Sequence, residues 1–404
     1  MKRNTTCLFI LFFSFIMILP GILKAQTHHK GEMHYSWKQF VMGADLSFVN
    51  EIEDFGGIYK ENNKKVDPFI LFKKHGCNNI RVRLWHDPEW IRAVAGGKIY
   101  SDLADVEKTM RRAKDAGMSV NLDLHYSDDW ADPNKQPTPD AWKDLSFEVL
   151  KDSVYQYTLS VLNYFKSRGL VPEMIQVGNE TNFGMLWPLG KIVDDKNWER
   201  FGELLNSGIR AVRQFSLTST IKPAIILHVA QMQFGPSWVE HITHLGKVTD
   251  FDIIGLSHYY KWSTVNVLSN VEDTIRLLRK RYGRKVMIVE TAFPWTFENA
   301  DHYNNLFGDP AELKGYNATK QGQLDYMIEL TQRVISAGGS GIMYWEPAWI
   351  TSPMKDRWGT GSAWENACLF DFNGNVLPGI HYMEHSYLNP KITTRRQAVN
   401  IQQN

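Results

Sequence analysis

Two glutamates stand at the ends of short apolar segments that have the composition of buried strands. Residues 174–180 read Met-Ile-Gln-Val-Gly-Asn-Glu and end at Glu180, and residues 286–290 read Val-Met-Ile-Val-Glu and end at Glu290. A charged residue at the carboxyl end of a buried parallel strand emerges where the loops begin. Two carboxyl groups at such an edge suggest glycoside hydrolysis, in which one donates a proton and the other attacks the sugar. For either glutamate alone, a solvated strand end or a salt-bridge partner is the competing interpretation.

The segments around these glutamates predict a single (β/α)8 TIM barrel with extended βα loops. Apolar runs predict eight strands, most of them buried on both faces, and amphipathic patterns between them predict helices that end at Ala116-Gly117 and Ala337-Gly338-Gly339. An open doubly wound sheet is the rival fold, but no predicted strand is followed by a glycine-rich phosphate loop. The predicted strands are 40–46, 78–85, 119–125, 174–180, 224–229, 251–258, 285–290 and 341–345, and the helices include 103–116, 149–166, 198–214, 271–282 and 321–337.

Such a barrel would carry a set of polar and aromatic residues at its carboxyl rim. His125 and His258 have carboxylates nearby but lack a local ligand pattern such as His-Glu-x-x-His, which speaks against a catalytic metal. Ser257 lies in no Gly-x-Ser-x-Gly turn, which speaks against serine hydrolase chemistry. The predicted rim residues are Asp45, Arg83, Trp85, His86, His125, Tyr126, Asp128, Asn179, Glu180, His258, Tyr260, Glu290 and Trp345.

Asn179-Glu180 at the fourth predicted strand and Glu290 at the seventh are placed as in clan A of the retaining glycoside hydrolases. Five ordered motifs narrow the likeness, because together they are more specific than an Asn-Glu pair. Spanning about residues 42 to 382, the chain resembles family 53, the endo-β-1,4-galactanases. The motifs are Gly-Ala-Asp-Leu-Ser (43–47), Arg-Val-Arg-Leu-Trp (81–85), Asp-Leu-His-Tyr-Ser-Asp-Asp-Trp-Ala-Asp-Pro (123–133), Gln-Val-Gly-Asn-Glu (176–180) and Gly-Ile-Met-Tyr-Trp-Glu-Pro (341–347).

The resemblance implies a role for each carboxyl group. Glu180 would protonate the glycosidic oxygen and later deprotonate water, so its pKa should lie above that of a free glutamate. Glu290 would attack the anomeric carbon, with Arg83 and Tyr260 favouring its ionised form. Retention then requires the two carboxyl groups to lie about 5 to 5.5 Å apart. Asn179 would hold the 2-hydroxyl of the sugar next to the cut.

The resemblance and the aromatic loops also predict the rest of a substrate groove. Trp345 would form a platform under the sugar at the cut, and His125 and His258 would line the cleft or stand as structural histidines. Trp130, Trp187 and Trp349 are further stacking candidates, for which plain packing is the alternative. The polar connection 126–147 is expected to form one wall of the groove. The full predicted substrate-binding set is Asp45, Arg83, Trp85, His86, His125, Asp128, Trp130, Asn179, Trp187, His258, Tyr260 and Trp345.

The chemistry requires no cofactor, but a structural Ca²⁺ is implied by some relatives, which bind it between the loops after the seventh and eighth strands. The sequence 298–305 departs from their alternating pattern and carries fewer carboxylates. The predicted ligands are Asn299, Asp301, Ser362 and Glu365.

The amino terminus predicts export. Lys2-Arg3 precede an apolar stretch from Cys7 to Leu23, and Lys24-Ala25-Gln26 follow it, which is typical of a cleaved signal peptide. A membrane anchor is the alternative, although Pro20-Gly21 interrupts a stretch of only about 18 residues. The predicted organisation is therefore a signal peptide (1–25), a catalytic domain (26–389) and a polar tail (390–404), and the protein should be secreted or periplasmic.

Composition limits the partners of the 404-residue chain. The formal charge of +1 and the absence of a long lysine or arginine cluster argue against nucleic acid. The 14 Trp, 16 Tyr and 21 Phe suit a protein that stacks on sugar rings, although most of these rings should be core. Cys77 and Cys368 allow at most one disulfide in the mature chain, and Cys77 is expected in the core.

We therefore predict a retaining endo-β-1,4-galactanase that cuts (arabino)galactan side chains of pectin, acts as a monomer and does not insert into membranes. An endo-β-1,4-mannanase or glucanase of the same clan would use the same two glutamates. A non-catalytic carbohydrate-binding barrel is a third alternative. The presence of Glu180, Glu290, Asn179 and Arg83 argues against it.

Overall fold

A computed structural model describes residues 35–265, 267–308 and 315–388 of the chain. The predicted signal peptide and the predicted polar tail lie outside these residues, so both stay predictions. None of the described helices is long and apolar enough to cross a membrane. Cys77 and Cys368 are both buried free thiols, so the described part of the chain is held together by packing and not by a disulfide between them.

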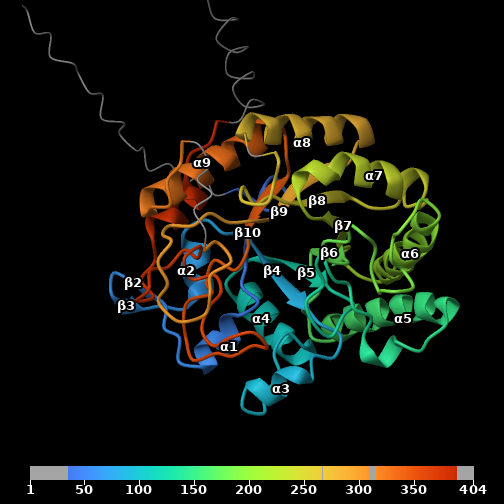
Figure 1. Cartoon of the computed structure of the whole chain (residues 1–404), viewed down its shortest axis with the longest axis horizontal. Helices are drawn as coiled ribbons and strands as arrows, with labels where there is room; N and C mark the ends of the chain where they lie inside the picture. Colours follow the sequence, from blue (N-terminus) through green and yellow to red (C-terminus); the bar gives the residue numbers. More distant parts are fainter. Residues whose placement is uncertain (1–34, 266, 309–314, 389–404) are drawn as a thin grey trace, which may run out of the picture. The chain divides into compact units, whose positions relative to one another are not determined.

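Eight parallel strands close into a barrel, as predicted. Most are short apolar runs because helices and the barrel interior bury both of their faces, whereas β4 and β5 alternate apolar with polar residues. The strands follow one another around the barrel in sequence order, with β1 pairing to β10 and β4 to close the ring (Figure 1). The barrel strands are β1 (Val41–Asp45), β4 (Asn79–Leu84), β5 (Ser119–Leu124), β6 (Met174–Val177), β7 (Ala224–Val229), β8 (Ile253–Ser257), β9 (Lys285–Thr291) and β10 (Gly341–Tyr344).

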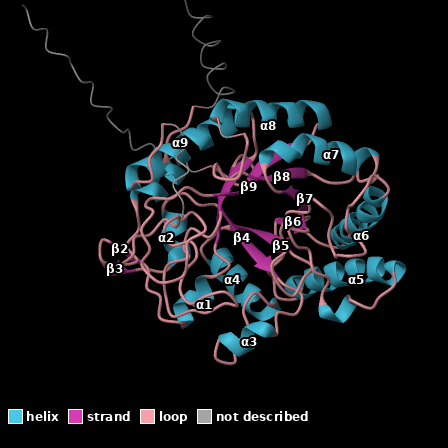
Figure 2. Cartoon of the chain, in the orientation of Figure 1, coloured by secondary structure: helices cyan, strands magenta, loops and turns pink. Residues whose placement is uncertain are grey.

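The helices lie outside this ring of strands (Figure 2). Five match the predicted helices closely: α4 (Leu103–Asp115), α5 (Phe147–Lys166), α6 (Asn197–Ser216), α8 (Leu268–Tyr282) and α9 (Lys320–Ser336). The glycines after α4 and α9 end them as predicted, because Gly117 and Gly338 take φ values of 73° and 72° that other residues rarely adopt.

Short elements escaped the sequence analysis because fewer than three turns show too little periodicity. A hairpin of β2 (Lys60–Glu61) and β3 (Lys64–Lys65) lies near the amino terminus of the barrel domain, and a 3-10 helix η3 (Pro378–Glu384) packs on α9 near the carboxyl end. The remaining short helices are α1 (Val49–Asp54), α2 (Pro68–Lys74), α3 (Trp90–Val94), η1 (Asp140–Trp142), η2 (Met232–Phe234) and α7 (Gly235–His244).

The barrel interior changes from apolar to charged along its axis. One layer is an apolar cluster that includes Val41, Met174, Ile253 and Met343. Gly43 makes room for this layer, because a Cβ there would lie 2.6 Å from Cγ of Met343. Further along the same strands, towards their carboxyl ends, the inward side chains become carboxylates, amides and arginine. The fold thus places its charged groups on a rigid apolar base.

Candidate active site

The two predicted catalytic glutamates meet at the carboxyl end of the barrel. A carboxylate oxygen of Glu180 and one of Glu290 lie within 4.8 Å of each other, although β7 and β8 separate their strands. Because the barrel is closed, the carboxyl ends of β6 and β9 face the same central opening. The pair can therefore act on a single linkage from two sides.

The turn that carries Glu180 has a strained backbone that its neighbours hold in place. Gly178 has φ 87° and Glu180 itself has φ 45°, a left-handed conformation that costs a non-glycine residue about 1 kcal/mol or more. Thr181 N donates to the carbonyl of His228 (3.0 Å), and the Asn182 amide exchanges two 2.8 Å hydrogen bonds with the backbone of Ala230. These bonds fasten the turn to the end of β7, so the orientation of Glu180 is set by the fold.

A bulge in β9 turns Glu290 into the barrel. The pairing of β8 with β9 runs Leu256 to Ile288 and then Ser257 to Glu290, so that Val289 is an extra residue. Val289 belongs to the apolar cluster inside the barrel. In a regular strand Glu290 would point away from the barrel interior, because Val289 before it points inward. The bulge breaks this alternation, so the Glu290 side chain also points inward.

Glu290 is surrounded by groups that favour its ionised form. Arg81 Nη2 lies 2.8 Å from one carboxylate oxygen, and the Tyr259 hydroxyl donates to the other at 3.0 Å. Burial raises the pKa of Glu290 to about 7, and the Arg81 guanidinium and the Tyr259 hydrogen bond limit this rise. The site thus offers a buried carboxylate with two firm donors.

Glu180 is also buried, but fewer groups favour its ionised form. Burial and the negative charge of Glu290 raise its pKa well above that of a free glutamate, and a hydrogen bond from the Ser257 hydroxyl at 2.5 Å opposes them. No arginine or lysine forms an ion pair with Glu180 among the described residues. Of the two carboxyl groups, Glu180 is therefore the better holder of a proton.

Arg81 connects the carboxylates beneath the site. Its guanidinium contacts Asp45 at 2.7 Å, Asp123 at 2.8 Å and Glu290 at 2.8 Å, and it also donates to Asn179 Oδ1 at 2.9 Å. Arg81 is 1% exposed, and the surrounding carboxylates raise its pKa further. A buried cation with three anions around it fixes the position of Glu290.

The predicted contact of Arg83 with Glu290 is wrong, because Arg81 makes it. Arg83 lies two residues further along β4, on the same face but about 7 Å nearer the rim. There it pairs with Glu346 at 2.7 Å and lies over the rings of Phe48 (4.1 Å) and Trp130 (4.3 Å). Burial raises the pKa of Glu346 to about 8. Arg83 thus contacts the aromatic side chains, and Arg81 contacts Glu290.

A hydrogen bond from Tyr260 was predicted for Glu290, and the observed donor is the hydroxyl of the neighbouring Tyr259. Inward side chains of β8 occur at every second position, and Tyr259 continues the alternation of Ser257 beyond the strand end. The Tyr260 ring points into the core, where it stacks on Phe307 with centroids 5.8 Å apart.

Asn179 lies beside both glutamates. Its amide donates to the Ala131 carbonyl at 2.9 Å, and its oxygen accepts from Arg81 and lies 2.9 Å from Nδ1 of His228. His228 in turn lies 2.8 Å from the Ser257 hydroxyl. Burial and the Arg81 charge hold the pKa of His228 well below its usual range, so the ring is neutral. A hydrogen-bonded path therefore runs from Glu180 through Ser257 and His228 to Asn179.

Four side chains of the predicted substrate-binding set have almost no surface to offer a sugar. Asp45, Arg83, Trp85 and His258 are each at most 2% exposed. Their predicted contact with a sugar stays a prediction, and the contacts observed for Asp45, Arg83 and Trp85 are with other protein groups. Trp85, for example, donates to Nδ1 of His125 at 3.2 Å, and His125 Nε2 lies 3.0 Å from Asp123. Burial lowers the pKa of His258 to about 4, so it is neutral.

Partly exposed tryptophans lie in the loops at the carboxyl rim of the barrel. Trp130 and Trp345 are neighbours with centroids 6.0 Å apart, and Trp364 supports Trp345 edge-on at 4.7 Å. Trp349 is 4% exposed, so it packs beneath them and offers little surface for stacking. The connection 126–147 supplies Trp130, and its role as one wall of a substrate groove stays a prediction. These rings place a stacking surface on the β10 side of the glutamates.

The remaining predicted residues lie further from the glutamates. His86 Nδ1 is 3.3 Å from Asp128, whose carboxylate also accepts from the backbone of Asp87 and Asp140. This set holds the β5 loop in shape. Trp187 is partly exposed in the loop after β6, with Lys191 over its ring at 4.2 Å.

The four predicted calcium ligands lie together, but most of their oxygens already accept hydrogen bonds from the protein. Asp301 accepts from the backbone of Tyr303 (2.7 Å) and of Ser362 (2.9 Å), and Glu365 Oε1 accepts from Ala300 N (2.6 Å). Asn299 accepts from the Asn305 amide. Glu365 Oε2 is buried without a partner. One open carboxylate oxygen does not fit an ion that takes about six to eight oxygens.

The residues that the sequence analysis missed are those that hold the glutamates, namely Arg81, Ser257, Tyr259 and His228. Strand alternation carries a signal for some of them, because Ser257 and Tyr259 share one face and Arg81 shares a face with Arg83. Depth along the barrel axis, which decides which arginine meets Glu290, has no signature in a single sequence.

A closed (β/α)8 barrel with two such carboxyl groups at its carboxyl rim is the arrangement of a glycoside hydrolase. The sequence model described as glycosyl hydrolase family 53 matches residues 41–383. The chain belongs to this family.

Similar proteins agree with this assignment. An arabinogalactan endo-beta-1,4-galactanase of Cellvibrio japonicus is 44% identical over 352 residues, which cover 86% of this chain and 91% of that protein. The catalytic domain of a family 53 enzyme from Ignisphaera aggregans superposes with a TM-score of 0.78 at 35% identity, covering 87% and 97% of the two chains. A fungal beta-1,4-galactanase gives a TM-score of 0.72 at 28% identity, covering 86% and 99%.

Proposed function

We propose that this protein is a retaining endo-β-1,4-galactanase that hydrolyses the galactan or arabinogalactan side chains of pectin. The observation that carries the mechanism is a pair of nearby carboxyl groups that differ in their partners. Glu290 is held by the Arg81 guanidinium and the Tyr259 hydroxyl, whereas Glu180 accepts from the Ser257 hydroxyl and has its pKa raised by burial and by the charge of Glu290. Their closest oxygens lie within 4.8 Å, which suits the separation of about 5 to 5.5 Å between the carboxyl groups of retaining enzymes. The names of the similar proteins support galactan as the substrate.

In the first step Glu290 attacks the anomeric carbon while Glu180 gives its proton to the glycosidic oxygen. The glycosidic bond breaks, the sugar chain on the reducing-end side leaves, and a glycosyl ester forms on Glu290. In the second step Glu180, now ionised, takes a proton from water, which attacks the anomeric carbon and releases Glu290. Two inversions give a product with the configuration of the substrate.

The neutral His228 ring has two tautomers, and each is compatible with one protonation state of Glu180. With its proton on Nε2, the ring donates to Ser257, whose hydroxyl donates to the ionised Glu180. With the proton on Nδ1, the ring donates to Asn179 and gives up the hydrogen bond that Glu180 N donates to Nδ1 (3.3 Å), and Ser257 can donate to Nε2 while Glu180 keeps its own proton. The two arrangements match the two states of an acid/base residue.

The primary test is a product profile of the purified mature protein on unbranched β-1,4-galactan, β-mannan and a cellulosic or mixed β-glucan. A ladder of galacto-oligosaccharides from galactan alone supports the proposal, and proton NMR of the first products should show the β-anomer. Cutting of mannan or glucan would favour the alternative specificity. Inactivity on all three would favour a carbohydrate-binding barrel.

The role of Glu290 has its own test. Glu290→Ala should abolish turnover and leave oligosaccharide binding nearly intact, and azide should restore activity by forming a glycosyl azide of inverted configuration. Glu148→Ala, which removes a carboxylate that is 78% exposed on α5, is the matched control and should behave as the wild type. Wild-type rates in Glu290→Ala would remove this residue from the mechanism.

The processing, location and oligomeric state of the protein are also part of this proposal. We expect cleavage after Ala25, secretion or export to the periplasm and a monomeric state, which amino-terminal sequencing and light scattering would test.

Asn179 is proposed to hold the 2-hydroxyl of the sugar at the cut. The family resemblance implies a structural calcium ion near Glu365, whereas the hydrogen-bonded oxygens observed there do not fit one. Elemental analysis and melting with and without a calcium chelator would test it.

A further inference from the structure

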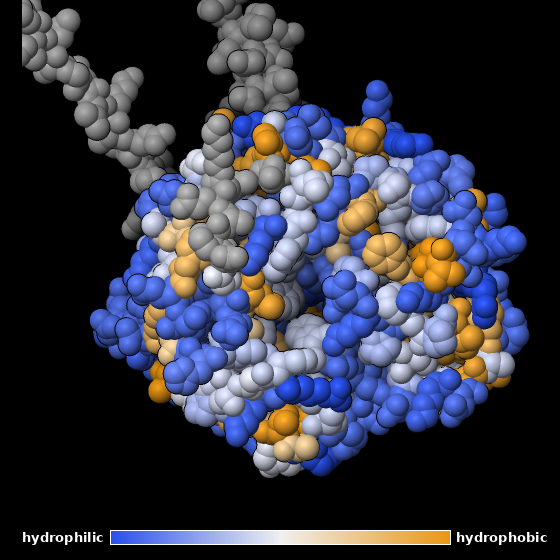
Figure 3. All heavy atoms as spheres, viewed as in Figure 1, coloured by the Kyte–Doolittle hydropathy of each residue, from blue (hydrophilic) through white to orange (hydrophobic). Residues whose placement is uncertain are grey.

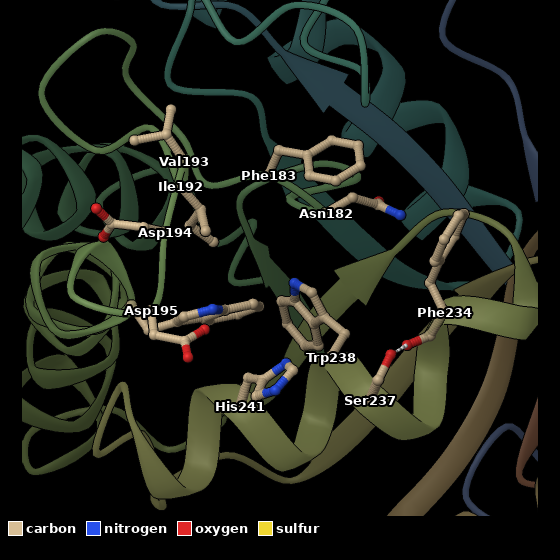
Figure 4. A pocket seen from close by; sticks show the side chains of 11 residues that line it. Asn182, Phe183, Ile192, Val193, Asp194, Asp195, Phe234, Ser237, Trp238 and His241 are labelled. Atoms are coloured by element: carbon tan, nitrogen blue, oxygen red, sulfur yellow. Dashed lines mark hydrogen bonds between the residues drawn. The ribbon is translucent and has the colours of Figure 1, made fainter.

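A second hollow lies beside the turn that carries Glu180. It has a volume of about 380 Å³ and is bounded by the loop after β6, by η2 and by α7. Figure 4 shows Phe183 and Phe234 on one side with Asn182 between them, and Asp194 and Asp195 on the opposite side. Trp238 and His241 of α7 complete the lining.

The wall of this pocket is fixed to the catalytic turn. Asn182 follows Glu180 by two residues, and its amide is held by the backbone of Ala230 at 2.8 Å in both directions. The Trp238 indole donates to the carbonyl of Thr181 at 3.0 Å. A ligand in the pocket would therefore have a defined position relative to Glu180.

The direction of the reaction places the leaving sugars on this side. A proton donor acts on the leaving oxygen, so the departing chain must lie near Glu180. The Trp345 surface lies at β10, which is four strands away from β6 in a ring of eight and therefore on the opposite side of the barrel. Figure 3 shows a hollow near the middle of one face, with apolar side chains between it and the edge over α6 and α7.

The pocket has the chemistry of a sugar site. Phe183 and Phe234 are 46% and 42% exposed, so each ring offers a surface to a ligand in the pocket. A galactose unit has an apolar face of C–H groups that can lie on such a ring, and its hydroxyls can donate to the carboxylates of Asp194 and Asp195. One apolar side and one acidic side suit a neutral polyhydroxylated ligand better than an anion or a purely apolar one.

We propose that this pocket binds galactose units on the reducing-end side of the cut, with Phe183 and Phe234 as their stacking surfaces. The inference rests on the proposed function and adds a binding site for the part of the chain that leaves. It makes these two rings determinants of where the enzyme cuts along an oligosaccharide.

The test compares two substrates in Phe183→Ala, Phe234→Ala and the double variant. The first is β-1,4-galactohexaose labelled at its reducing end, and the second is an aryl β-1,4-galactobioside whose leaving group is a phenol and not a sugar. The ratio of kcat/KM for the hexaose to that for the aryl glycoside should fall about fivefold for one ring and about twentyfold for both. The labelled leaving fragment should also become shorter, because cuts nearer the reducing end need fewer sugars in the pocket.

The control is Leu217→Ala, which removes an apolar side chain that is 75% exposed at the end of α6. It should keep both the ratio and the fragment lengths of the wild type. A double variant with the wild-type ratio and fragment pattern would overturn the inference while leaving the proposed function intact. If the wild type cuts neither galactan nor the hexaose, the proposed function itself fails.

Discussion

Tyr259→Phe tests how the site keeps Glu290 ionised. The substitution removes one hydroxyl, which donates to Glu290 Oε2 at 3.0 Å, and keeps the ring that packs against Trp262 and Trp364. Tyr259 and Glu290 are each 5% exposed, so water does not readily replace the lost donor. A hydrogen bond to a buried charged group contributes about 1.5 to 3 kcal/mol.

Loss of the hydrogen bond from Tyr259 changes the pKa of Glu290 and with it the pH dependence of activity. The hydroxyl stabilises the carboxylate and not the carboxylic acid, so its loss raises the pKa of Glu290 by about 1 to 2 units. The nucleophile must be ionised, so activity falls as the pH drops through this pKa. The acidic limb of the profile should therefore move to higher pH, and at a fixed pH on that limb kcat/KM should fall roughly 10- to 100-fold.

The assay is the pH dependence of kcat/KM on a galacto-oligosaccharide, with melting temperatures to confirm folding. Tyr382→Phe is the matched control, because it removes another buried tyrosine hydroxyl that has no hydrogen-bond partner among the described residues. It should leave the acidic limb in place. An acidic limb of Tyr259→Phe that coincides with that of the wild type would refute the reasoning.

Two further predictions concern stability. Arg81→Met leaves Asp45, Asp123 and Glu290 buried without their shared cation. It should lower the free energy of unfolding in urea by roughly 3 to 5 kcal/mol at pH 7, and a loss below about 1 kcal/mol would contradict the role of Arg81. Burial raises the pKa of Glu51 to about 8 from 4.5, so between these values the unfolded chain releases a proton that the native protein keeps, and stability falls as the pH rises. Glu51→Gln removes this penalty, so its stability advantage over the wild type should grow by on the order of 3 kcal/mol from pH 5 to pH 8, whereas parallel stability curves would show that Glu51 is ionised in the native state.

The contrast between Arg81 and Arg83 shows where sequence reasoning stops. The motif places both arginines in one strand with the same inward face, and a rim residue is the natural choice for a catalytic contact. The structure gives the contact to the deeper arginine, because the β9 bulge and the tilt of the strands set how far Glu290 reaches into the barrel. Neither the β9 bulge nor the tilt of the strands produces a recognisable pattern in the neighbouring sequence.

The tyrosines show a related limit. Ser257 and Tyr259 share one face of the chain at the end of β8, so alternation favours Tyr259 over Tyr260 as the partner of Glu290. The family resemblance indicated that a tyrosine after β8 contacts Glu290. Which of the two neighbouring tyrosines does so depends on which ring packs into the core. Tyr260 fills that core position against Phe307.

The sequence by itself determined the eight strands, the order of the helices, the closed barrel and the two glutamates at the strand ends. These features depend on apolar runs, helix periodicity and glycine stops, all of which act over a few residues. Tertiary structure alone decided which charged groups meet: Arg81 with Glu290, Arg83 with Glu346, and Glu180 with Ser257 and His228. The physical reason is that these contacts join strands far apart in the chain, and their partners depend on strand register, on the β9 bulge and on the depth of each side chain in the barrel.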